Sequence, residues 1–230
     1  MAARTALGGR LIVVSGTGTG IGKTYLCEAL LTALRASGRR VAGLKPVETG
    51  LSEGGLSDAQ RLDRASSFHV KQSEYRFAEP ISPHLAAREE GKPIVIERIL
   101  AEVASLRREI DVALVELAGG LFTPLSDATV NAHLARALQP DSLILVAADR
   151  LGALHETIST TLAAGGLSVP ITDVVLMAPE CPDSSTGRNA AELVRLNAVP
   201  WAISLPRAQL EDLSLHAALQ TLATRVEASS

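Results

Sequence analysis

The chain has 230 residues, of which 47% are hydrophobic and 20% charged, and its formal net charge is −3 at pH 7. This is the composition of a globular protein with a sizeable core, and it excludes intrinsic disorder. The small negative charge argues against broad binding to nucleic acid or to a membrane surface. The arginine pairs Arg39-Arg40 and Arg107-Arg108 are interpreted as solvated helix ends.

The two cysteines, Cys27 and Cys181, are too few for a disulfide framework and are not spaced as metal ligands. No apolar run approaches the roughly 18 residues of a membrane span. The N-terminal region also lacks the apolar segment of a signal peptide. We therefore expect a cytoplasmic protein.

Short apolar runs typical of buried strands alternate along the chain with longer amphipathic segments typical of helices. The expected strands are 11–14, 41–44, 112–115, 143–146, 174–177 and 201–203. The expected helices are 24–37, 58–68, one beginning at 96, 128–138, 152–164, 186–197 and 208–224. This alternation predicts an α/β fold, a mainly parallel sheet with helices on both faces. Since no repeat or long linker divides the sequence, we expect one domain over residues 1–230.

Residues 16–24, Gly-Thr-Gly-Thr-Gly-Ile-Gly-Lys-Thr, stand between the first expected strand and the first expected helix. This is the context of a P-loop, whose glycines let backbone N–H groups surround phosphate oxygens at a helix N-terminus. Lys23 is expected to contact the outer phosphates, and the Thr24 hydroxyl to bind Mg²⁺. Five residues separate Gly16 from Gly22, one more than the usual pattern. The loop predicts a P-loop NTPase-type sheet that binds a nucleoside triphosphate and Mg²⁺.

Polar residues follow two further expected strands, at the edge where α/β sheets bind ligands. Lys45 ends the second strand, and Glu116 ends the strand at 112–115, where it can complete a metal's ligands. Taken alone, Lys45 is better interpreted as an exposed lysine at a strand end, and Asp58 as a helix-capping acid. For Glu116 alone, a surface carboxylate at a strand end is nearly as good an interpretation. The following Ala118-Gly119-Gly120, whose glycines allow close backbone approach, favours a functional role for Glu116.

Together these segments resemble the dethiobiotin synthase family. The matching segments, in order, are 16–24, 45–50, 57–59, 77–80, 82–84, Glu116 with 118–120, and 122–127. They cover most of residues 11–155, and the long phosphate loop is itself the family's form. Each segment is a weak signal alone, whereas the ordered set is specific.

The resemblance implies an ATP-dependent cyclo-ligase that forms C–N bonds in biotin biosynthesis. Such an enzyme carboxylates 7,8-diaminononanoate with CO₂ or bicarbonate, phosphorylates the carbamate and closes the ureido ring. The products are dethiobiotin, ADP and phosphate. The resemblance also implies Mg²⁺ as cofactor and a homodimer.

The resemblance further implies residue roles. Lys45 and Lys23 are the implied catalytic residues, with Lys45 facing the carbamate, and the implied metal ligands are Thr24, Asp58 and Glu116. The implied nucleotide-binding residues are Gly20, Ile21, Gly22, Lys23, Thr24, Tyr25, Asp58, Glu116, Leu117, Ala118, Gly119, Leu205, Pro206 and Arg207. The implied substrate-binding residues are Thr19, Thr49, Leu151, Gly152, Ala153 and Leu154. The last four are expected to receive the substrate carboxylate, often from the partner subunit.

The sequence departs from the family pattern at several positions. Gly20 replaces an acid, His155 replaces an asparagine, and Leu117 replaces a glycine, so its side chain is expected to be able to crowd the nucleotide. The asparagine expected to contact adenine is absent, because residues 177–180 read Met-Ala-Pro-Glu. The preference for the base is left open by these departures.

Three alternatives are weighed. An amide ligase of the cobyrinate type would need a glutamine-hydrolysing module, for which no nucleophilic cysteine is visible. A partitioning or septum-site ATPase switch would carry a second lysine where this chain has Gly18. A catalytically inactive scaffold is disfavoured because all five key polar residues are present, namely Lys23, Thr24, Lys45, Asp58 and Glu116.

Overall fold

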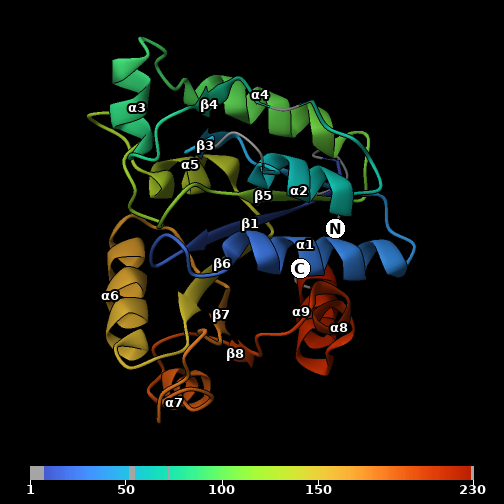
Figure 1. The fold of residues 1–230 in the computed structure, drawn as a ribbon, viewed down its shortest axis with the longest axis vertical. Coiled ribbons are helices and arrows are strands. Elements are labelled where there is room, and N and C mark those ends of the chain that lie inside the picture. Colours follow the sequence, from blue (N-terminus) through green and yellow to red (C-terminus); the bar gives the residue numbers. More distant parts are fainter. Residues whose placement is uncertain (1–7, 52–54, 72, 229–230) are drawn as a thin grey trace.

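The computed structural model describes residues 8–51, 55–71 and 73–228. Its centre is a six-stranded sheet in the order β2-β5-β1-β6-β7-β8, in which every neighbouring pair is parallel (Figure 1). The strands are β1 (Arg10–Gly16), β2 (Val41–Leu44), β5 (Val112–Glu116), β6 (Ser142–Ala148), β7 (Asp173–Met177) and β8 (Ala202–Leu205). All six lie where short apolar runs predicted them. The predicted parallel α/β sheet is confirmed.

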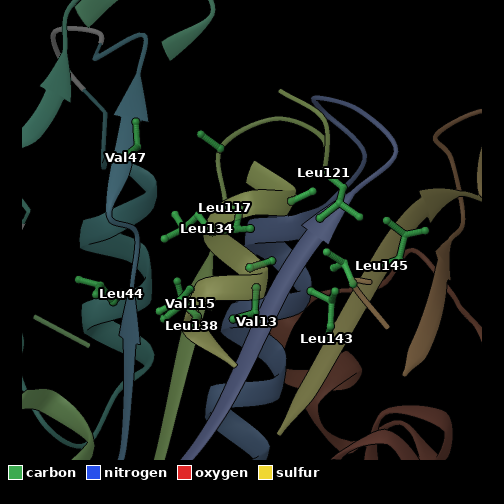
Figure 2. Packing of buried hydrophobic residues seen from close by; sticks show 14 of the residues in the cluster. Val13, Leu44, Val47, Val115, Leu117, Leu121, Leu134, Leu138, Leu143 and Leu145 are labelled. Carbon is green, nitrogen blue, oxygen red and sulfur yellow. The ribbon is translucent and has the colours of Figure 1, made fainter. Parts of the chain in front are cut away.

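Helices cover both faces of this sheet, because side chains alternate between the faces along each strand. Ile12 and Val14 of β1 pack toward the cluster formed with α1 (Lys23–Ala36), α2 (Asp58–Ala65), α8 (Leu210–Leu215) and α9 (Ala217–Ala228). Leu11 and Val13 pack toward the cluster formed with α4 (Ile96–Arg107), α5 (Asn131–Leu138), α6 (Ala153–Gly166) and α7 (Asn189–Arg195). Figure 2 shows part of this second cluster. Because aromatic residues are scarce, the core consists mainly of Leu, Val, Ile and Ala.

A second, two-stranded parallel sheet lies beyond the edge strand β2. It consists of β3 (Val47–Thr49) and β4 (Tyr75–Phe77), and α3 (Pro83–Glu89) packs against it (Figure 1). The sequence did not predict these elements, because each strand has three residues and a charged residue at its centre. The small sheet places Thr49 and the start of α2 near the carboxyl end of β2.

Several helices are shorter than predicted. The helix expected at 58–68 ends at Ala65, where Ser66 turns to extended backbone and its hydroxyl donates to the Leu62 carbonyl. The helix expected at 208–224 is two helices, α8 and α9. They separate at His216, which has extended backbone and whose Nδ1 accepts from the Ala218 N–H. The helices expected at 128–138 and 186–197 begin later, as α5 and α7.

Arg107 is not a solvated helix-end residue as expected. Its side chain is buried, and its guanidinium donates to the Gly9 carbonyl at 2.6 Å and to Asp141 at 3.3 Å. It joins the end of α4 to the start of β1. In the part of the chain that the structure describes, no helix has both the length and the apolar character needed to cross a bilayer.

Candidate functional site

The carboxyl ends of β1, β2 and β5 converge on one cavity of about 630 Å³. Most of the predicted site residues line it, although they come from distant parts of the sequence. These are Thr19, Gly20, Gly22, Lys23, Thr24, Tyr25, Lys45, Thr49, Asp58, Glu116, Ala118 and Gly119. The cavity lies at the edge of the sheet where α/β proteins bind ligands.

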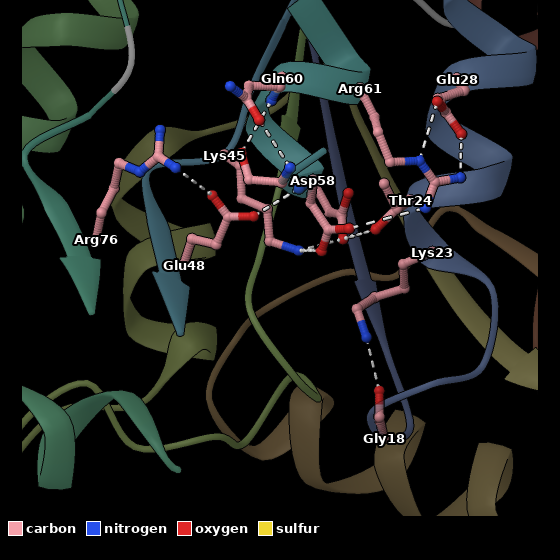
Figure 3. A network of polar contacts seen from close by, with 12 residues as sticks. Gly18, Lys23, Thr24, Glu28, Lys45, Glu48, Asp58, Gln60, Arg61 and Arg76 are labelled. Carbon is pink, nitrogen blue, oxygen red and sulfur yellow. Dashed lines mark hydrogen bonds and ion pairs between the residues drawn. The ribbon is translucent and has the colours of Figure 1, made fainter. Parts of the chain in front are cut away.

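The predicted phosphate loop connects β1 to α1. Gly22 caps α1 with φ of 92°, a left-handed conformation that side chains other than glycine rarely adopt. Lys23 is buried, and its Nζ donates to the Gly18 carbonyl at 2.7 Å, so the amine lies over its own loop (Figure 3). Burial lowers the pKa of Lys23 below its ordinary value, and nearby Lys45 lowers it further, while Glu116 opposes the shift. Such a loop at a helix N-terminus is built to hold phosphate groups.

Gly120, the second glycine after β5, lies against this loop, as its close-approach role predicted. A Cβ on Gly120 would stand 3.1 Å from the Gly16 carbonyl oxygen. The Leu121 N–H donates to the same Gly16 oxygen at 2.8 Å. The segment after Glu116 therefore packs against the beginning of the phosphate loop and donates a hydrogen bond to it.

A lysine and two carboxylates form the centre of the site. Glu116 Oε1 accepts from the Thr24 hydroxyl and from Lys45 Nζ, each at 2.9 Å, and Lys45 also contacts Asp58 (Figure 3). Burial alone would lower the pKa of Lys45, but Glu116 and Asp58 outweigh it and raise that pKa above its ordinary value. Burial would likewise raise the pKa of Asp58, but Lys45 outweighs it and lowers that pKa. Lys45 is thus a charged ammonium that two anionic side chains hold in place.

The residues predicted to bind metal fit a magnesium ion. Thr24, Asp58 and Glu116 offer a hydroxyl and two carboxylates, the oxygen ligands that Mg²⁺ takes. Glu116 Oε2 is buried and has no hydrogen-bond partner among the described residues, a costly arrangement unless another group uses that oxygen. Among the described residues, no group of three or more His, Cys, Asp and Glu side chains forms a metal site of its own. Thr24, Asp58 and Glu116 therefore suit an ion that takes its remaining ligands from bound phosphates.

Asp58 is fixed at the first turn of α2 by its surroundings. Ser57 and Gln60 form a reciprocal capping box at this end of the helix. The buried carboxylate of Glu48, on β3, accepts from the Asp58 N–H at 2.6 Å. The small sheet, which was not predicted from the sequence, thus holds the predicted metal ligand Asp58 in position.

A second cavity of about 830 Å³ continues from the first, because both share Thr19, Gly20, Gly22 and Tyr25. Its remaining lining consists of Ile21, Ala148, Arg150, Met177, Ala178, Pro179, Glu180, Arg207, Ala208 and Gln209. The Tyr25 hydroxyl donates to the Ala208 carbonyl, which ties α1 to the loop after β8. The second cavity therefore extends from the phosphate loop to the segments that follow β6, β7 and β8.

Some predicted residues do not line either cavity. Leu205 is buried in the core, Pro206 is absent from both linings, and Leu117 is buried among the core side chains near Leu134 (Figure 2). The expected crowding by Leu117 is wrong, because the side chain points into the core. The segment 151–154 surrounds the start of α6, and its Leu151 is 78% exposed.

Several residues that line the two cavities were not predicted from the sequence. Arg61 and Thr123 line the first cavity, and Arg150 lines the second. Arg61 stands three positions after Asp58, on the same face of α2, and this helical spacing is the signal that could have indicated it. No comparable signal indicates Arg150.

Comparison with known proteins identifies the family of the chain. A family model described as an AAA domain matches residues 10–213. Over 210 residues the chain is 37% identical to the ATP-dependent dethiobiotin synthetase BioD of Anaeromyxobacter dehalogenans (strain 2CP-C), covering 86% of this chain and 93% of that protein. The chain belongs to the dethiobiotin synthetase family. The Bacillus subtilis (strain 168) synthetase is 30% identical over 192 residues, covering 81% of this chain and 83% of the relative.

Solved structures share the fold with this dethiobiotin synthetase family member. The cell division ATPase MinD of Pyrococcus furiosus superposes with a TM-score of 0.58 at 20% identity, covering 95% of this chain and 98% of that chain. The septum site-determining protein MinD of Pyrococcus horikoshii, complexed with Mg-ADP, gives a TM-score of 0.57 at 15% identity, with 95% and 96% covered. At such identities the likeness shows the P-loop NTPase fold alone.

Proposed function

We propose that this protein is an ATP-dependent dethiobiotin synthase. The observation that carries the proposal is the Lys45 ammonium, held by Asp58 and Glu116 within reach of the phosphate loop. Both the triphosphate and the carbamate of this reaction are anions, so their encounter needs concentrated positive charge. Thr49 lines the same cavity, on the side of the small sheet, where it is available to a second ligand.

The proposed sequence begins when one amine of 7,8-diaminononanoate captures CO₂ and loses a proton to give a carbamate. A carbamate oxygen attacks the γ-phosphorus, and ADP leaves. The second amine then attacks the carbonyl carbon and loses a proton, phosphate leaves with the electrons of the C–O bond, and the ureido ring closes. Lys45 stabilises the carbamate and Lys23 the phosphates, by positioning and electrostatics without a covalent intermediate on the protein.

Thr24, Asp58 and Glu116 would hold Mg²⁺, which when bound neutralises phosphate charge. Mg-ADP in the Pyrococcus horikoshii MinD structure supports this choice of ion by fold analogy. We also propose that the second cavity takes the nucleotide base, with Arg207 and Gln209 at its edge. Since the described residues that line this cavity include no asparagine, the base preference is to be measured.

We further propose a homodimer in which residues 151–154 of one subunit receive the substrate carboxylate bound to its partner. The exposure of Leu151, and the fact that residues 151–154 belong to neither cavity lining, support a role across an interface. A single domain over residues 1–230 and a cytoplasmic location stay predictions.

The test incubates purified protein with 7,8-diaminononanoate, ¹³C-bicarbonate, Mg²⁺ and one of several nucleoside triphosphates. We expect dethiobiotin that carries the label in its ureido carbonyl, with one nucleoside diphosphate released per ring closed. Absence of labelled dethiobiotin with every triphosphate would reject the proposal. Hydrolysis that proceeds equally well without the diamine would instead favour the ATPase switch.

A further inference from the structure

An ion pair joins the two helices that carry the proposed metal ligands. Thr24 lies in the first turn of α1, and Asp58 is the first residue of α2. Glu28 and Arg61 lie one turn further along these helices, at spacings that put them on the same faces as the ligands. Arg61 Nε donates to Glu28 Oε1 at 3.1 Å, and its Nη2 contacts Glu28 Oε2 (Figure 3).

The pair is built to be rigid. Two parallel N–H···O contacts between a guanidinium and a carboxylate fix both distance and orientation. The Glu28 side chain is 11% exposed and that of Arg61 is 34% exposed, so water screens the pair only in part. The contact therefore limits how far α2 can move from α1.

Arg61 also lies close to one of the ligands. Its Nη1 is 3.9 Å from Asp58 Oδ1, which is within ion-pair range but longer than a hydrogen bond. A guanidinium released from Glu28 could approach Asp58 and compete with a metal for its carboxylate. Glu28 therefore keeps the positive charge of Arg61 away from the Asp58 carboxylate.

We infer that the Glu28–Arg61 pair is a positioning clamp for the magnesium site. It fixes Thr24 relative to Asp58 and keeps the Asp58 carboxylate available to the ion. The inference rests on the proposed function, because it needs a bound Mg²⁺-triphosphate. The alternative is that Arg61, which lines the first cavity, contacts the phosphates directly.

The test measures triphosphate affinity with Mg²⁺ and, separately, with a metal chelator, for Arg61→Ala, Glu28→Ala and the double variant. A non-hydrolysable triphosphate analogue is the ligand, and Mn²⁺ affinity in its presence is followed by paramagnetic resonance. Loss of residues that orient metal ligands costs about 10–100-fold in metal affinity, and we expect the lower part of that range. Affinity without metal is expected to stay unchanged. The double variant should be no weaker than either single variant, because the two residues act as one unit.

Arg35→Ala is the matched control. Arg35 also joins α1 to the end of α2, through the carbonyls of Arg64 at 3.5 Å and Ser66 at 3.4 Å. It does so far from the ligands, so its loss should leave the Mg²⁺ effect unchanged. Arg61→Lys, which keeps the charge without the paired donors, should fall between the unaltered protein and Arg61→Ala.

Three results would overturn the inference. Equal weakening with and without metal would assign Arg61 to direct phosphate contact. A loss in Arg61→Ala no larger than in Arg35→Ala would reduce the pair to a general helix contact. If the unaltered protein binds the analogue equally with and without Mg²⁺, the proposed metal site itself is wrong and the clamp with it.

Discussion

Removing the Lys45 ammonium should separate turnover from nucleotide binding. Lys45→Met keeps most of the stem of this buried side chain, which is 7% exposed, and removes only its charge. Loss of one preorganised group that stabilises developing charge costs about 10²–10³ in turnover, or about 2.7–4 kcal/mol. The residues at 16–24 still hold the phosphates, so triphosphate affinity should change by no more than about threefold, the behaviour of an interaction made chiefly in the transition state.

The substitution also leaves Glu116 and Asp58 without their shared cation. Breaking a buried ion pair by removing one partner costs about 3–5 kcal/mol of folding stability. The assay is therefore run at a temperature where circular dichroism shows the variant folded, with dethiobiotin formation and nucleotide titration measured on one preparation. Lys71→Met, at an exposed lysine, serves as the control and should change neither quantity. Equal losses of turnover and affinity in Lys45→Met would refute the assignment of Lys45 to the carbamate.

Two further substitutions test the phosphate loop and a buried hydrogen-bond network at the end of β6. In Gly16→Ala the new Cβ would stand 2.5 Å from Ile21 Cδ1 and 3.2 Å from Lys23 Cδ, so both side chains of the phosphate loop must move, at a cost of about 1 kcal/mol. We expect a matching loss of triphosphate affinity by titration, and an unchanged affinity would contradict the loop geometry. Asp149, buried at the end of β6, accepts from Asn189 Nδ2 at 2.7 Å and from the Ser204 hydroxyl at 2.8 Å. Asp149→Ala should lower the free energy of unfolding, measured in urea, by about 3–5 kcal/mol, since hydrogen bonds to a charged group contribute about 1.5–3 kcal/mol each. A urea midpoint and slope like those of the unaltered protein would contradict this stabilising role of Asp149.

The strands of the main sheet could be predicted because burial on both faces makes them continuous apolar runs. The small sheet could not, because Glu48 and Arg76 occupy the centres of its strands and interrupt any apolar pattern. The break at His216 was also missed, since α8 and α9 both present apolar residues to the same cluster and read as one helix. Local patterns thus find elements with a long buried face, and they miss short elements and turns held by single side-chain contacts.

The same contrast holds for the site. Lys23, Thr24, Lys45 and Glu116 could be placed because strand ends and a glycine loop determine their positions. The Glu28–Arg61 pair could not, because its members lie 33 residues apart and each alone resembles an exposed helix residue. Contacts between two helices depend on tertiary packing, which no local spacing encodes.

The order of strands has a consequence for how the chain matures. The strand β1 is synthesised before the other strands of its sheet, yet its two neighbours are β5, at residues 112–116, and β6, at residues 142–148. Until those segments leave the ribosome, the apolar strand next to the phosphate loop has no partner on either edge. Pairings so distant in sequence make folding slow and expose aggregation-prone edges meanwhile. We expect nascent chains that stop before β6 to depend on chaperones and to bind no nucleotide, whatever loop they already carry.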